Sequence, residues 1–150
     1  MYEYQIKVTR VVDGDTVDAD VDLGFSTWLH DQRIRLSSID TPETRTKNDI
    51  EKFYGQLAKK FLSDLLQNRD VTLQSHGRGK FGRILGTLFA EGLNVNEEMI
   101  VQHHAVRYEG KSKALISDAH KANRQELYKD GYAEKFLSEI VEESKTAKND

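Results

Sequence analysis

The chain has 150 residues, of which 37% are hydrophobic and 31% charged, as is usual for a soluble globular protein with one buried core. Its net charge of −3 argues against a protein that coats nucleic acid unselectively, because such binding needs many Lys and Arg contacts to phosphates. The absence of cysteine excludes disulfides and thiolate metal sites. No apolar run reaches the roughly 20 residues that cross a bilayer, so we expect no membrane association.

Strand-like patterns fill most of the first ninety residues. Alternation predicts strands over about 4–12, 16–23 and 32–39, and Asp13-Gly14 forms the turn between the first two. Residues 24–31 are predicted as a loop. Its aromatic residues Phe25 and Trp28 could stack on bases, but we favour rings that close the end of a barrel.

Two further strands and four helical patterns follow. The strands are predicted over about 71–74 and 83–89, around a basic loop. The expected helices cover residues 48–68, 94–103, 112–129 and, more weakly, 132–141. Five short strands with an inserted helix, followed by more helices, predict an α+β fold: a small closed β-barrel with helices packed on it. We expect one domain over residues 1–141 and a frayed, charged tail over 142–150.

Four acids lie at two predicted strand ends. Asp13 and Asp15 flank a glycine turn, while Asp40 and Glu43 belong to the corner Asp-Thr-Pro-Glu, which contains the chain's only proline, Pro42. Proline fixes its own φ and restricts the preceding residue, so this corner holds its acids at a set angle. Hard cations such as Ca²⁺ bind several oxygen ligands. The alternatives are an ordinary turn and an ordinary start of a helix.

Arg35 and Arg83 complete the pattern. Either arginine alone is readily interpreted as a solvated surface residue. Together they could hold a phosphate, because the guanidinium fork matches phosphate oxygens with paired hydrogen bonds. A cation near such a pair neutralises the charge that develops during phosphoryl transfer, and Glu43 could orient or deprotonate the attacking water. These residues indicate a metal-dependent phosphodiesterase. The five histidines are assigned structural or surface roles.

Three motifs occur in order: residues 13–16, residues 35–43 and residues 80–83. In this order they resemble the signature of the staphylococcal (micrococcal, or thermonuclease-type) nucleases, over about residues 6–131. The resemblance implies a five-stranded OB-fold barrel with three packed helices. It also implies calcium-dependent hydrolysis of DNA and RNA that leaves 3′-phosphate ends, with another divalent cation left open.

The resemblance also implies a metal site. By position, Asp15 and Asp40 would bind the ion through their carboxylates and Thr41 through its carbonyl oxygen. Asp13 would lie just outside these direct ligands.

The same resemblance implies a catalytic and substrate-binding set. Arg35 and Arg83 would hold the scissile phosphate, and Glu43 would position or deprotonate the water. Lys80 would help to bind a terminal phosphate of the substrate.

The chain departs from the family pattern in three places. Phe81 stands where the family has a tyrosine beside the lysine, which removes a hydroxyl from the nucleotide pocket. Tyr108 is assigned to that pocket although its segment differs in length, and the loop over 23–31 is longer. Because the N-terminus lacks the features of a signal peptide, we expect a cytoplasmic or phage-encoded relative.

The main alternative is a catalytically silent OB-fold module that binds nucleic acid or a protein. Domains that lose activity are expected to lose site residues, yet all five central ones are present: Asp15, Arg35, Asp40, Glu43 and Arg83. A calcium-binding structural domain would leave both arginines without a function. We therefore predict a nuclease that acts on DNA or RNA as a monomer.

Overall fold

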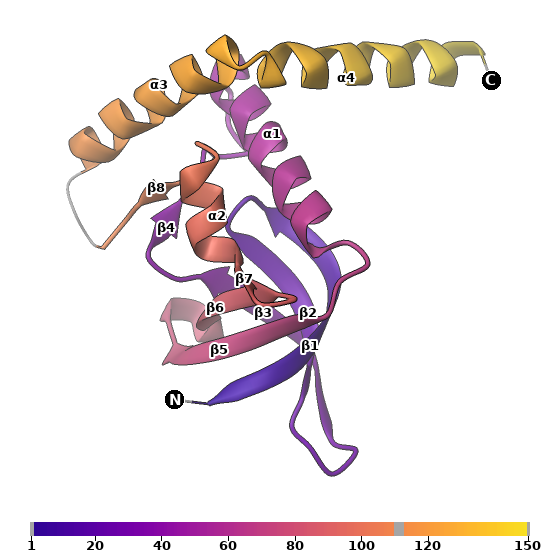
Figure 1. Cartoon of the computed structure of the whole chain (residues 1–150), viewed down its shortest axis with the longest axis vertical. Helices are drawn as coiled ribbons and strands as arrows, with labels where there is room; N and C mark the ends of the chain where they lie inside the picture. The colour runs from indigo at the N-terminus through magenta and orange to yellow at the C-terminus, as the bar shows by residue number, and fades with distance from the viewer. Residues whose placement is uncertain (1, 110–112, 150) are drawn as a thin grey trace.

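The computed structural model describes residues 2–109 and 113–149, which form a barrel with helices packed over one end (Figure 1). The strands are β1 (Glu3–Asp13), β2 (Thr16–Asp22), β3 (Trp28–Leu36), β4 (Ile39–Asp40), β5 (Val71–Arg78), β6 (Ile84–Ala90), β7 (Leu93–Asn94) and β8 (Val106–Arg107). The helices are α1 (Asp49–Leu66), α2 (Val95–Val101), α3 (Lys113–Lys129) and α4 (Tyr132–Asn149), with a 3₁₀ turn at Lys80–Gly82.

Five strands close the barrel. They follow the order β3-β2-β1-β5-β6, and a parallel pairing of β3 with β6 joins the two ends, with Ile34 opposite Ile84. The other pairings between neighbours are antiparallel. The α+β class and the OB-type five-stranded barrel predicted from the sequence are therefore confirmed.

The core follows the predicted alternation. In β2 the side chains of Val17, Ala19 and Val21 are buried, while the intervening aspartates are partly exposed. Helix α1 packs its apolar face on the open end of the barrel, and its first turn is capped by Asn48, which accepts a hydrogen bond from the Glu51 amide at 3.0 Å. These interactions fix α1 above the two strand ends that carry the acids.

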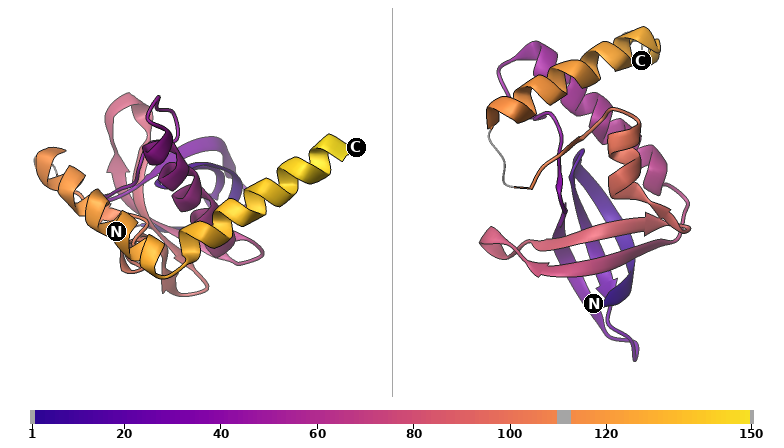
Figure 2. Two further views of the ribbon diagram at one scale, coloured as in Figure 1. Left: turned by 90° about the horizontal axis from the view of Figure 1, so that it is seen from above. Right: turned by 60° about the vertical axis from the view of Figure 1, so that its left-hand side comes forward.

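Helix α4 differs from the expectation. The helical pattern expected over 132–141 continues to Asn149, and α4 is a fourth helix beside the three that the family resemblance implies. Residues 142–149 contain neither glycine nor proline, and nothing in that stretch stops a helix. Figure 2 shows α3 and α4 crossing the helical end of the molecule. In residues 2–109 and 113–149, no helix has both the length and the apolar character to span a membrane.

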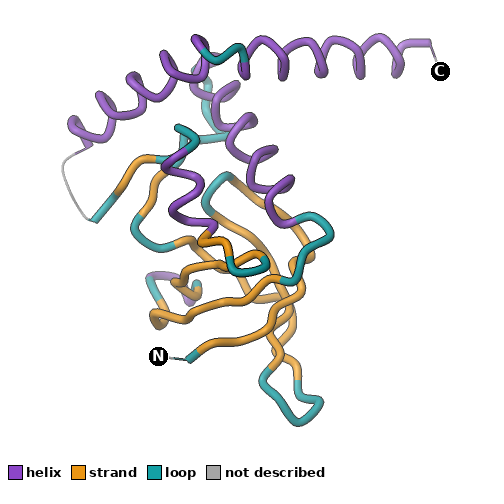
Figure 3. Tube along the Cα trace, viewed as in Figure 1, coloured by secondary structure: helices purple, strands orange, loops and turns teal. Residues whose placement is uncertain are grey.

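The hairpin of β2 and β3 corrects another expectation. Strand β3 already begins at Trp28, so the loop is shorter than predicted and is closed by a hydrogen bond from the Leu23 amide to the Thr27 carbonyl at 2.8 Å. The side chain of Phe25 is fully exposed, and Trp28 is 42% exposed. The predicted plug of the barrel end is therefore wrong, because the hairpin extends beyond the barrel wall and carries its tip into solvent (Figure 3).

Candidate active site

The predicted acids and arginines meet in one small pocket of about 160 Å³. It lies where the β1–β2 turn, the end of β3 and the corner after β4 come together. In the β2–β3 ladder Thr16 pairs with Arg35, and the Leu36 amide donates to the Asp15 carbonyl at 2.8 Å. The pocket is lined by Asp13, Asp15, Thr16, Arg35, Asp40, Thr41, Pro42, Glu43 and Arg83.

Asp15 is the most enclosed acid of the pocket. Its carboxylate accepts hydrogen bonds from the Thr16 hydroxyl at 2.9 Å and the Thr41 amide at 3.3 Å, and its Oδ2 lies 3.4 Å from Nη2 of Arg35. Burial raises the pKa of Asp15, and the attraction of Arg35 offsets this only in part. An additional cation in the pocket would therefore favour the ionised carboxylate.

Asp40 is held from two sides. The β4–β8 ladder pairs it with Val106, and its carboxylate Oδ1 lies 3.8 Å from Nη2 of Arg35. On the other side, Nε2 of His120 in α3 lies 2.9 Å from Asp40 Oδ2, at hydrogen-bond distance. The sequence alone predicts only a structural or surface role for His120. The contact joins residues 80 positions apart, and no motif around His120 signals it.

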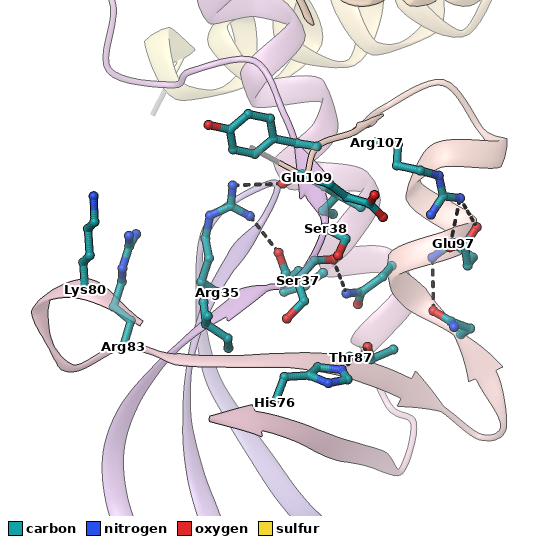
Figure 4. Close-up of a pocket in the computed structure, with 16 residues that line it drawn as sticks. Arg35, Ser37, Ser38, His76, Lys80, Arg83, Thr87, Glu97, Arg107 and Glu109 are labelled. Atoms are coloured by element: carbon teal, nitrogen blue, oxygen red, sulfur yellow. Dashed lines mark hydrogen bonds and ion pairs between the residues drawn. The ribbon is translucent and has the colours of Figure 1, made fainter. Parts of the chain in front are cut away.

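Arg35 is anchored in place rather than exposed on the strand. Its Nη1 donates to the Leu36 carbonyl at 2.8 Å, and its Nη2 donates to the Ile39 carbonyl at 2.9 Å. Figure 4 shows Arg35, Arg83 and Lys80 standing side by side and pointing the same way. The guanidinium groups of Arg35 and Arg83 therefore face the same pocket.

Arg83 immediately precedes β6. In the part of the chain that the structure describes, its Nε is buried and has no hydrogen-bond partner. A buried donor without a partner is unfavourable, and an anion in the pocket would supply the missing acceptor.

Glu43 follows the corner and is exposed to solvent, although the pocket partly desolvates its carboxyl. Burial raises the pKa of its carboxyl, and the negative charges of Asp15, Asp13 and Asp40 raise it further. The corner itself is held by α1, because a Cβ atom at Gly55 would lie only 2.6 Å from the Glu43 carbonyl oxygen. Glycine at this position allows the helix to approach the backbone that carries Glu43.

The donor set fits a hard cation that keeps part of its water shell. Asp15, Asp40 and the Thr41 carbonyl offer only oxygen ligands, which is the chemistry that Ca²⁺ and Mg²⁺ prefer. Among residues 2–109 and 113–149, no cluster of three or more His, Cys, Asp or Glu side chains is placed to hold an ion by itself. Asp13 accepts a hydrogen bond from the Thr44 hydroxyl, which ties the β1–β2 turn to the corner.

A larger cavity of about 780 Å³ adjoins the pocket and shares Arg35 and Arg83 with it. Lys80 and Tyr108 line this cavity, whereas Phe81 does not: its ring is 96% exposed and lies over a neighbouring hollow of about 550 Å³. The structure thus brings two of the three predicted substrate-binding residues to one cavity.

Several polar residues of this cavity were not predicted. The amide of buried Asn96 donates to the carbonyls of Ser37 and Gly86, at 3.1 and 3.2 Å, and fixes the base of the cavity. His76 Nε2 lies 2.9 Å from the Thr87 hydroxyl. In β8, Nη2 of Arg107 donates hydrogen bonds to both carboxylate oxygens of Glu97 (Figure 4). These contacts depend on the barrel closing, which local sequence patterns do not reveal.

Comparisons with known proteins found a matching family model and several similar proteins. A family model described as "Staphylococcal nuclease homologue" matches residues 33–132. An uncharacterized endonuclease of Escherichia coli is 36% identical over 104 residues, which is 69% of this chain and 60% of the relative. The thermonuclease of Staphylococcus intermedius is 39% identical over 80 residues, 52% of this chain and 44% of the relative.

A further similar protein, Endonuclease YhcR of Bacillus subtilis (strain 168), is 35% identical over 115 residues, 71% of this chain. The match covers only 9% of that much longer protein. The chain thus spans less than two thirds of the length of each of these three relatives.

Proposed function

Since this chain belongs to the family of staphylococcal nuclease homologues, we propose that it hydrolyses phosphodiester bonds of nucleic acids with the help of a bound divalent cation. The observation that supports this most is the convergence of Arg35, Arg83 and Glu43 with two buried or half-buried aspartates in one pocket. These parts come from three separate stretches of the chain.

In this proposal the two arginines bind the scissile phosphate. Arg35 is fixed by two backbone carbonyls, so its guanidinium needs little rearrangement when the substrate binds. Arg83 has the buried Nε that gains an acceptor when a phosphate oxygen enters. As charge builds on the phosphoryl oxygens, these pre-positioned donors stabilise the transition state more than the ground state.

Glu43 is proposed to orient the attacking water or to take its proton. Partial desolvation and the neighbouring acids raise the pKa of its carboxyl, which makes the carboxylate a better proton acceptor than an isolated glutamate. The close packing of Gly55 against its backbone limits movement of the corner that carries Glu43.

Asp15, Asp40 and the Thr41 carbonyl are proposed to hold the cation, with Asp13 just outside them. Ca²⁺ is our first candidate, and another divalent ion is the alternative. A bound ion would supply positive charge beside the phosphate and lower the pKa of water. Burial raises the pKa of Asp15 and Arg35 offsets this only in part, so a cation beside this carboxylate would stabilise its ionised form.

We further propose that both DNA and RNA are substrates and that the products carry 3′-phosphate ends. Lys80 and Tyr108 would bind the substrate in the larger cavity, whose volume of about 780 Å³ lies in the range of small-molecule sites. The exposed ring of Phe81 would contact the substrate outside that cavity. That the protein acts as a cytoplasmic monomer stays a prediction.

The test is cleavage of plasmid DNA and of a labelled RNA in Ca²⁺, Mg²⁺, Mn²⁺ or EDTA, by the protein and by its Glu43→Gln variant. We expect cleavage that requires a metal and falls at least about 100-fold in the variant, since general-base catalysis contributes about that much or more. Cleavage at equal rates by both proteins would contradict the role of Glu43. If the folded protein binds nucleic acid but never cleaves it, the alternative of a catalytically silent OB-fold module would hold instead.

A further inference from the structure

A third hollow, of about 510 Å³, lies between α1 and α3 and shares no lining residue with the two cavities described above. Figures 1 and 2 show these helices meeting near the start of α1. We call this hollow the α1–α3 groove. Its lining consists of Ile50, Tyr54, Lys121, Arg124, Gln125, Tyr128 and Lys129.

The groove combines positive charge with aromatic surface. Three of its side chains are cationic, and among the described residues that line it none is acidic. Lys129 is partly neutralised by Glu126, 3.7 Å away, so Lys121 and Arg124 supply most of the charge. The Arg124 guanidinium lies 6.0 Å from the centre of the Tyr54 ring, and Tyr128 is 63% exposed. Cations for the backbone and exposed rings for the bases are what single-stranded nucleic acid requires.

Both walls of the groove are attached to the acid corner of the active site. In α3, His120 contacts Asp40, and Arg124 follows one helical turn later. In α1, Gly55 lies directly against the corner backbone, next to Tyr54 in the groove. From His120 to Tyr128 the helix rises about 12 Å, so the groove begins beside the site and leads away from it.

We propose that the α1–α3 groove binds the single-stranded nucleic acid on one flank of the cleaved bond. Phosphates contact Lys121 and Arg124, and a base stacks on Tyr128. This inference rests on the proposed nuclease function, which it extends to substrates longer than the active site alone can hold. Continuity with the site favours the substrate strand over an acidic protein segment, since a strand held by Arg35 and Arg83 must leave the pocket along some surface.

The test separates long from short substrates. Binding of a labelled DNA single strand, long enough (about 12 nucleotides) to cross both site and groove, is measured in EDTA over a series of salt concentrations. Cleavage of a dinucleotide with metal is measured in parallel. The variants are Lys121→Glu and Tyr128→Ala. The controls are Lys135→Glu, the same charge change on the exposed face of α4, and Tyr2→Ala, which truncates an exposed tyrosine just before β1.

We expect Lys121→Glu to weaken binding of the strand by roughly 5- to 10-fold at low salt and to lower the salt slope by about 0.7, the value for one phosphate contact on a single strand. Tyr128→Ala should weaken it at least about 5-fold through lost stacking. Both variants should cleave the dinucleotide at the normal rate, and both controls should bind normally.

Two results would overturn the inference. If the wild-type protein cleaves but both variants bind the long strand normally, the groove is no part of the substrate site and the nuclease function stands. If the wild-type protein neither cleaves the dinucleotide nor binds the strand, both proposals fail. Circular dichroism verifies folding, and Lys121→Glu decides alone if Tyr128→Ala unfolds, since Lys121 is exposed.

Discussion

Replacing His120 with alanine should weaken metal binding, although His120 belongs to no motif of the site. The ring of His120 contacts Asp40 at 2.9 Å and fixes the orientation of a carboxylate that we propose as a metal ligand. The His120 side chain is 13% exposed and that of Asp40 is 30% exposed, so solvent competes with this hydrogen bond only in part.

The magnitude follows from the type of bond. A hydrogen bond to a charged group contributes about 1.5–3 kcal/mol, and partial exposure of Asp40 favours the lower end. About 1.5 kcal/mol corresponds to a roughly 10-fold weaker metal affinity, within the range found when groups that orient metal ligands are removed. His120→Gln, which can place an amide donor near the position of Nε2, should recover most of the loss.

The assay is titration calorimetry of Ca²⁺ into each variant, with the melting temperature in EDTA as a measure of folding. A purely structural role would lower the melting temperature without separating glutamine from alanine. Two outcomes would refute the reasoning: an unchanged affinity in His120→Ala, or a tighter one, which would mean that the ring competes with the ion for Asp40.

Three further substitutions test other parts of the structure. Arg83→Ala should lower kcat/KM about 100-fold or more with an unchanged melting temperature, because it removes a pre-positioned phosphate donor; a change below 5-fold would exclude Arg83 from the transition state. Gly55→Ala should reduce both stability and activity, since its Cβ would lie 2.6 Å from the Glu43 carbonyl oxygen; urea unfolding that gives a stability gain would contradict this close approach. Burial lowers the pKa of His104 from 6.5 to about 4, so between these pH values the unfolded chain binds a proton that the folded protein does not. Stability should therefore fall as the pH drops from 6.5 toward 4, by up to about 3 kcal/mol, and His104→Phe should remove that part of the slope in urea unfolding at pH 7 and pH 5; identical slopes would refute it.

Local patterns predicted the parts of the fold whose reasons are local. The alternation of β2 and the helical spacing of α1 indicate which face of each element is buried, and the structure agrees. The corner at Pro42 was recognisable because proline restricts the backbone on both sides. The exposed tip at Phe25 was not recognisable in the sequence. How far the hairpin extends beyond the barrel depends on how far β2 and β3 stay paired, and the residues of the tip do not reveal this.

Contacts between distant segments escaped prediction for a related reason. His120 meets Asp40 because α3 lies across β8, and just before that strand the side-chain amide of Asn123 donates to the Ala105 carbonyl at 3.1 Å. Sequence spacing gives the face of α3 on which His120 lies, but not the element that this face meets. The acid corner and the helix α3 were both visible in the sequence, whereas the contact between them was not.

The closure of the barrel explains why the two arginines lie beside one pocket. Inward residues of β3 and β6, such as Ile34 and Ile84, are buried at the seam where these strands pair in parallel. Because side chains alternate along a strand, Arg35 and Arg83 both lie on the outer side of that seam. A one-residue slip of the register would turn one of them into the core, where an unpaired guanidinium is strongly disfavoured. The same burial that closes the barrel therefore sets the spacing of the two arginines that we propose to bind phosphate, and the pocket exists only once the seam has formed.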